Sequence, residues 1–362
     1  MFLRFQKLIR RLILLKKTYM SSPNKIASLE LARVVAIVAI VVIHSQVFLT
    51  FGHIGNEPWL SYIVNQLARF AVPLFFIISG YLIAPKLLEN PWQTAKQYCS
   101  PLMMFWLVWS VIALLMPFNM ASVVEHGYFA ERSGYWNFLL LTPLNSLLEG
   151  GLVHLWFIPS LVIAVFLCAF AIVTGYLRLL LPIALALYIY GVLAGSYQVI
   201  TEIEPPFFTR NGPFFSLLMV AIGLELRVKN VRIQSYQAII LAALGMIIHF
   251  SEAAFLHDFG QVFNMNDYLF GTALWASGMF LWFLANPKIG NTRWVQHLAS
   301  WSLAIYLIHL LVVILMFNLA GILGWQGLLK DALVFIGALS ISYVLARLLE
   351  RSPLAFIVVR RK

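Results

Sequence analysis

The sequence predicts an all-α, polytopic membrane protein with about ten transmembrane helices. Three observations lead to this class. Hydrophobic residues make up 62% of the 362 residues, only 11% are charged, and the mean hydropathy is +0.87. A soluble domain of this length could not cover its surface with so little charge. Apolar stretches long enough to cross a bilayer recur along the whole chain, and the cations gather on alternate connections between them.

Each expected span is an apolar run of roughly 20 residues, the length that an α-helix needs to cross a hydrocarbon core of about 30 Å. The two least regular runs are 177–195 and 212–226. The ten expected spans lie near 34–51, 59–84, 98–117, 152–175, 177–195, 212–226, 232–251, 267–285, 301–322 and 329–349.

The basic charge orients the chain. The net charge is +11, and if the N-terminus is cytoplasmic, roughly 21 of the 25 Lys and Arg side chains fall on the cytoplasmic side. Most acidic residues fall on the other side. This positive-inside pattern indicates an even number of spans with both termini in the cytoplasm. It favours contact with anionic membrane lipid over nucleic acid.

Three segments are expected. Residues 1–30 form a basic amphipathic segment that lies on the cytoplasmic leaflet and lacks the features of a signal peptide. Residues 31–350 form the membrane domain, with one long outer connection at 118–151. Residues 351–362 form a basic cytoplasmic tail. Cys99 and Cys168 both fall in spans, which argues against a disulfide framework and a thiolate metal site.

Ionisable residues inside the spans are the main functional signal, because each costs about 2.5–3.5 kcal/mol even on lenient insertion scales. Arg33 and His44 are eleven residues apart, which is about 16 Å along a helix with an offset of only about 20° around it. They therefore share one face, with the arginine at the cytoplasmic edge and the histidine near the midplane. Arg69 and His309 are expected at a similar depth, in a shared polar cavity or with separate hydrogen-bond partners.

This spacing suits a thioester of coenzyme A. An arginine at the membrane edge can hold the phosphates of the nucleotide by charge-assisted hydrogen bonds. A neutral histidine half a membrane deeper can act as general base to a hydroxyl. The same residues are also compatible with a proton-coupled transporter or glycan exporter, and the third alternative is a membrane partner of a separate transferase.

Four blocks resemble acyltransferase family 3, the multi-span bacterial enzymes that acylate surface polysaccharides. Arg33 and His44 are similar to the family's first-span Arg/His pair. "RFAVPLFFIISGYLI" (69–83), "HLWFIPSLV" (154–162) and "SLAIYLIHLLVV" (302–313) resemble its later blocks, in the same order and at suitable spacing. The resemblance covers most of the chain.

The resemblance implies acyl transfer, usually of acetyl, from acetyl-CoA as co-substrate to a sugar hydroxyl, with no bound cofactor and no metal. The acceptor would be a cell-surface polysaccharide or its lipid-linked precursor, as for the stand-alone O-acetyltransferases that act on enterobacterial common antigen. The location would be the bacterial cytoplasmic (inner) membrane. The resemblance also makes His44 the critical residue. From the residues themselves we expect His44 to act as general base or, as a second choice, as acyl carrier, and Arg69 to stabilise the developing oxyanion. One departure is the segment 92–101, where the family often carries several arginines and this chain has only Lys96.

The remaining candidates are polar or aromatic residues near these blocks, and for each the alternative is an ordinary structural role at a helix end or membrane interface. For the acyl donor we expect contacts from Arg33, Lys96, Ser79 and Tyr81. For the acceptor or the cavity wall we expect His154, Trp156, Arg210, Asn211, Glu252, Tyr306 and His309.

Overall fold

The structure, a computed structural model, describes residues 26–359. The basic segment expected at 1–30 lies mostly outside the described residues, as does the end of the tail. Within the described part every regular element is a helix, and the one β-type contact is an isolated bridge between Ile54 and Glu57. The all-α class is therefore confirmed.

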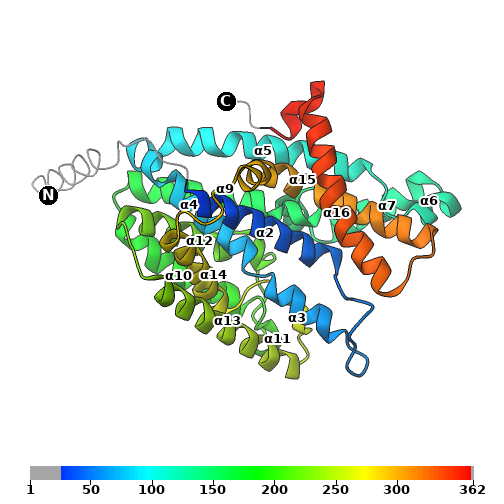
Figure 1. The fold of residues 1–362 in the computed structure, drawn as a ribbon, viewed down its shortest axis with the longest axis horizontal. Helices are drawn as coiled ribbons and strands as arrows, with labels where there is room; N and C mark the ends of the chain where they lie inside the picture. The colour runs from blue at the N-terminus through cyan, green and yellow to red at the C-terminus, as the bar shows by residue number, and fades with distance from the viewer. Residues whose placement is uncertain (1–25, 360–362) are drawn as a thin grey trace, which may run out of the picture.

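The helices follow one another along the chain as a bundle (Figure 1). In order they are α2 (Ala27–Ser45), α3 (Trp59–Leu67), α4 (Ala71–Glu89), α5 (Pro91–Leu115), α6 (Met120–His126), α7 (Tyr128–Leu141), α8 (Pro143–Glu149), η1 (Val153–Trp156), α9 (Phe157–Val173), α10 (Leu177–Leu193), α11 (Gln198–Thr201), η2 (Thr209–Asn211), α12 (Pro213–Val228), α13 (Ser235–Asp258), η3 (Phe263–Met265), α14 (Phe270–Ala285), α15 (Arg293–Ile322), α16 (Gly327–Glu350) and η4 (Pro353–Ile357).

Seven helical stretches of the described residues, not ten, are long and apolar enough to cross a membrane. The other three expected spans correspond to α10, α12 and α14, which have 17, 16 and 16 residues. Helices of this length rise only about 25 Å, less than a hydrocarbon core of about 30 Å. The multi-span class is thus supported, whereas the count of ten and the side of each terminus remain predictions.

Two expected spans have different boundaries in the structure. The first was expected at 34–51, but α2 begins at Ala27 and ends at Ser45, because Gln46 adopts the left-handed conformation that terminates a helix. The second was expected as one helix over 59–84. It is interrupted by a turn at residues 68–70, which separates α3 from α4 and contains Arg69.

The expected long connection 118–151 folds into α6, α7 and α8. Arg132 on α7 is fully buried, with its guanidinium over the rings of Phe118 and Tyr135, 4.3 and 5.1 Å from their centroids. Glu131 accepts two hydrogen bonds from this guanidinium. The hydrogen bonds from Arg132 hold the pKa of Glu131 below its usual range, so the pair stays ionised at neutral pH.

The centre of the bundle is formed by α2, α4, α12 and α15. In Figure 1, α2 crosses the middle of the molecule between α5 and α13. It packs against α15, α4 and α16. Buried residues make up 67% of the apolar window of α15 but only 22% in α13 and α16, which therefore lie at the edge of the bundle.

Two glycines allow α4 and α12 to cross closely. A Cβ atom at Gly80 would lie 2.1 Å from the carbonyl oxygen of Val220, and one at Gly223 would lie 2.1 Å from that of Ile77. Contacts this short are possible only without side chains, as is common where membrane helices pack. Gly80 therefore fixes the position of α4, which carries one wall of the cavity described next.

Candidate active site

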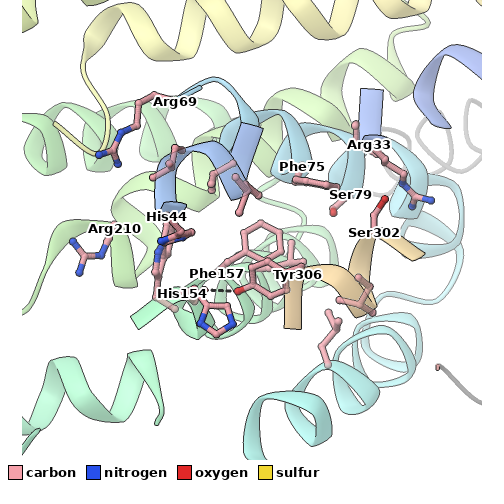
Figure 2. Close-up of a pocket in the computed structure, with 18 of the residues that line it drawn as sticks. Arg33, His44, Arg69, Phe75, Ser79, His154, Phe157, Arg210, Ser302 and Tyr306 are labelled. Carbon is pink, nitrogen blue, oxygen red and sulfur yellow. Dashed lines mark hydrogen bonds between the residues drawn. The ribbon is translucent and has the colours of Figure 1, made fainter. Parts of the chain in front are cut away.

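One cavity of about 430 Å³ lies inside the bundle. Its walls come from α2, α4, α5, α9 and α15, with further side chains from η1, η2 and the connection before α14. Most of the wall is apolar, and the polar groups lie at the two ends and in the middle (Figure 2). An enclosed, largely apolar space with a few convergent polar groups is the usual form of a small-molecule site.

Arg33 marks one end of the cavity, where Ser79 of α4 and Ser302 of α15 lie near it (Figure 2). Its side chain is 34% exposed, and its contact with Glu30 is long, with 3.5 Å between NH1 and Oε2. A weakly paired and accessible guanidinium has most of its donors available for an incoming anion. This end of the cavity is therefore suited to bind phosphate.

His44 lies in the middle of the cavity, beside two other histidines that are almost completely buried. The centroid of its ring is 6.5 Å from that of His154 and 5.1 Å from that of His309, and the last two centroids are 5.1 Å apart. The three residues come from α2, η1 and α15, so the packing of those elements creates a cluster that none of them contains alone.

Backbone contacts determine which nitrogen of each neighbouring ring carries the proton. A carbonyl only accepts, so Nδ1 of His309 donates to Tyr306 O at 2.7 Å, and Nε2 of His154 donates to Leu307 O at 3.3 Å. The second nitrogens, Nε2 of His309 and Nδ1 of His154, are buried and have no hydrogen-bond partner within residues 26–359. Both neighbours of His44 thus carry an unprotonated nitrogen when they are neutral.

Tyr306 connects two walls of the site. Its hydroxyl donates to the backbone carbonyl of His154 (Figure 2). Its ring packs against Phe157, at 5.6 Å between centroids, and against His154, at 5.4 Å. Tyr306 therefore fixes η1 against α15 and keeps the histidine cluster assembled.

Arg69, Asp267 and Arg210 form the other end, and Glu149 lies behind them as a further partner of Arg210. Asp267 receives one hydrogen bond from Arg69 NH1 at 2.8 Å and one from Arg210 NH1 at 2.7 Å. Arg210 also bonds Glu149 through NH2 at 2.7 Å. Arg69 donates in addition to Asn65 Oδ1 and to the carbonyl of Asn264. Two arginines thus share one carboxylate where the cavity meets the segments that carry η2 and η3.

Of the residues expected from the sequence, eight line this cavity. They are Arg33, His44, Arg69, Ser79, His154, Trp156, Arg210 and Tyr306. His309 is packed behind His44, where its side chain is inaccessible.

Four expected residues lie elsewhere. Lys96 is exposed on α5, outside the cavity wall. Tyr81 faces away from the cavity and contacts Arg227, with 3.2 Å between its hydroxyl and NH1. Asn211 donates to Asn145 and Glu149. Glu252 accepts from the backbone N–H groups of Phe270 and Gly271 and so caps the start of α14.

The sequence did not indicate Asp267 and Glu149 as site residues. Both appeared only as outer acidic residues, because their arginine partners are 198, 57 and 61 positions away and no local spacing connects them. The one available signal was Asp267 at the start of an expected span. In the described part of the chain, no group of three or more His, Cys, Asp or Glu side chains is arranged to hold a metal ion.

A multi-span helical bundle with an internal cavity, polar at both ends and with a histidine cluster between them, defines a class of membrane protein whose cavity suits a small, partly polar ligand. The family model described as an acyltransferase domain, that of acyltransferase family 3, matches residues 26–347. The chain therefore belongs to this family.

The curated proteins that are similar to this chain share only about a quarter of the aligned residues with it. An amino-acid racemase from Enterococcus faecalis is 26% identical over 341 residues, which cover 89% of this chain and 45% of that protein. A serine/alanine racemase from Enterococcus gallinarum is 25% identical over 289 residues, 76% of this chain and 39% of that protein. The chain thus spans less than half the length of these relatives. No solved structure matches it.

Proposed function

We propose that this protein is an integral-membrane O-acyltransferase that moves an acyl group, in the first place acetyl, from acyl-CoA to a hydroxyl of a cell-surface polysaccharide or its lipid-linked precursor. One observation carries the proposal. The same cavity contains Arg33 at one end, His44 in the middle and the Arg69–Asp267–Arg210 cluster at the other end. This order suits a donor entering from one side and an acceptor from the other.

The donor end has the chemistry that coenzyme A requires. Arg33 offers charge-assisted hydrogen bonds to phosphate, and Ser79 and Ser302 offer hydroxyl groups beside it. Between Arg33 and His44 the wall is formed by apolar side chains such as Ile40, Phe75 and Leu303. A thin pantetheine arm would lie along this wall and bring the thioester to His44.

The position of His44 in the middle of the cavity supports a role as general base, because a neutral imidazole can accept a proton from a hydroxyl group. In the proposed step His44 removes the proton from the acceptor hydroxyl, and the oxygen attacks the thioester carbonyl. The C–S bond then breaks, and the proton passes to the departing CoA sulfur. The alternative in which His44 first carries the acyl group uses the same contacts.

Arg69 supports the proposed oxyanion role through its position and its remaining donors. Three of its five N–H groups are used by Asn65, Asp267 and Asn264. Two remain for a developing negative charge, and these contacts hold the guanidinium in place in advance.

The competing proposal is a proton-coupled transporter or glycan exporter, which the buried histidine cluster and the two polar cavity ends also suit. The racemase names of the relatives do not support racemase activity in this chain, because more than half of each of those proteins lies outside the aligned part.

The test uses purified protein in proteoliposomes with acetyl-labelled acetyl-CoA and a glycan extract. The measurements are release of the CoA thiol and label on the glycan. We expect transfer by the wild type and by His53→Ala, whose histidine is exposed and outside the cavity, and loss of transfer in His44→Ala. A folded wild type that cleaves neither acetyl-CoA nor longer acyl-CoAs would favour the transporter.

A further inference from the structure

A second cavity, of about 460 Å³, adjoins the first and shares two of its wall residues, Arg210 and Asp267. The remainder of its wall comes from 194–199, 205–209 and 261–268, which connect α10 to α12 and α13 to α14. These segments are far apart in the sequence. The Arg210–Asp267 ion pair is therefore a partition between two spaces, in addition to being a polar end of the first one.

We propose that the second cavity binds the glycosyl acceptor and that the Arg210–Asp267 pair is the gate through which the acceptor hydroxyl reaches His44. This inference rests on the proposed acyl transfer and adds the acceptor site to it. The first cavity is mainly apolar and suits the donor, whereas the second is bordered by hydroxyl and amide side chains, among them Ser196, Gln198, Thr209 and Gln261.

The second cavity has the groups that recognise a sugar. Within the described residues, the side-chain amides of Gln198 and Gln261 have no protein partner, and the contact of His257 with Gln261 uses the backbone carbonyl, so each amide offers donors and an acceptor to hydroxyl groups. Phe208 offers an aromatic ring, 46% exposed, beneath the guanidinium of Arg210, whose Cζ lies 4.8 Å from the ring centroid. Flat apolar surface beside amide groups matches the mixed polarity of a pyranose.

The gate is built to open without leaving a charge unpaired. If the 2.7 Å contact between Arg210 and Asp267 breaks, Arg210 keeps its bond to Glu149 and Asp267 keeps its bond to Arg69. Nε of Arg210, a residue that lines both cavities, is buried and has no hydrogen-bond partner in residues 26–359. It is available to donate to an entering hydroxyl, which partly compensates for the broken contact.

The test places a removable block in the second cavity. Val199 lines it and is 41% exposed, whereas Val124 on α6 is 85% exposed and lines neither cavity. Val199→Cys and Val124→Cys are modified with a bulky, membrane-impermeant maleimide in nanodiscs. The native Cys99 and Cys168 are buried, which keeps background labelling low. The measurements are transfer from acetyl-CoA to the glycan extract, affinity for acetyl-CoA, and the labelling rate with and without the extract.

We expect modified Val199→Cys to lose transfer about tenfold or more, with acetyl-CoA affinity unchanged, and modified Val124→Cys to remain active. The glycan extract should slow labelling at position 199 and not at 124. Full transfer by modified Val199→Cys, or labelling unaffected by the extract, would overturn the inference. If Val199→Cys does not fold, Met265→Cys, at a position that also lines the cavity and is 63% exposed, supplies the same test. Absence of transfer in unmodified wild type, measured first, would instead reject the proposed function and the inference with it.

Discussion

At the scale of single residues, the groups that line the cavity are held in two different ways. Arg33 and His44 lie on one helix, where spacing alone determines that they share a face. Arg69, His154 and Arg210 lie in a turn or in short 3-10 helices. The directions of their side chains depend on how separate elements pack. Asp267 becomes part of the site only through its ion pairs with arginines on other segments. Sequence spacing cannot supply such contacts.

The role of Arg33 gives the first residue-scale prediction. Arg33→Ala should raise the KM for acetyl-CoA about tenfold to hundredfold with little change in kcat, because charge-assisted hydrogen bonds to phosphate are lost. The KM of Arg33→Lys should lie between those of the wild type and Arg33→Ala, because lysine keeps the charge and loses the bidentate geometry.

Steady-state kinetics in proteoliposomes measure both parameters. Arg293→Ala is the control, as Arg293 is exposed and does not line the cavity. An unchanged KM in Arg33→Ala would remove Arg33 from the donor site.

The ion pairs of Asp267 give the second residue-scale prediction. Asp267→Asn should destabilise the protein by about 2 kcal/mol, less than for a fully buried pair because the Asp267 side chain is 33% exposed. The two arginines would then repel each other with no full negative charge between them. Thermal unfolding in detergent should show a melting temperature lower by several degrees, whereas the exposed Asp258→Asn should change little. Equal stability of the two variants would contradict the role given to this ion pair.

At the scale of elements, the sequence predicted where helices occur and not how they are interrupted. All ten expected apolar stretches overlap helices, yet the break at 68–70 was missed. Residues 59–84 are mainly apolar, and the three residues of the turn, 68–70, include neither Gly nor Pro. The hydrogen bonds of Gln66 and Arg69 to the 263–267 segment accompany the turn, and these contacts are tertiary.

The crossing of α4 and α12 gives the element-scale prediction. Gly80→Ala should reduce thermal stability strongly or prevent folding, because its Cβ would lie 2.1 Å from the carbonyl oxygen of Val220. Gly134→Ala on α7 is the matched control, since nothing lies within 4 Å of the added Cβ and alanine favours a helix by about 1 kcal/mol. Fluorescence-detected size-exclusion chromatography after heating compares the two. A Gly80→Ala protein as stable as Gly134→Ala would show that the close crossing is wrong.

At the scale of the whole molecule, composition and charge were sufficient to predict the class of protein. They were not sufficient to predict the number of membrane crossings. The positive-inside pattern predicts that both ends of the chain share the cytoplasmic side. Seven helical stretches within residues 26–359 are long and apolar enough to span a membrane, and α10, α12 and α14 decide whether the count reaches ten. Short helices of this kind are stabilised by packing against neighbouring helices. A hydropathy pattern carries no information about that packing.

Cysteine accessibility tests this topology. In intact cells, an impermeant thiol reagent should label Val124→Cys, and should label Arg293→Cys and Leu354→Cys only after permeabilisation. All three positions are exposed in the structure, and both native cysteines are buried. Labelling of residues 124 and 293 from the same side would contradict the odd number of crossings that the expected topology has between them.

The central claim is that one cavity holds the donor, with its phosphates at Arg33 and its thioester at His44. The most direct measurement is a cryo-electron microscopy structure with a non-hydrolysable acetyl-CoA analogue. We predict that the nucleotide phosphates contact Arg33 beside Ser79 and Ser302, and that the carbonyl carbon of the analogue lies within about 4 Å of the ring of His44. An analogue bound outside this cavity, or one whose carbonyl group lies away from His44, would contradict the claim.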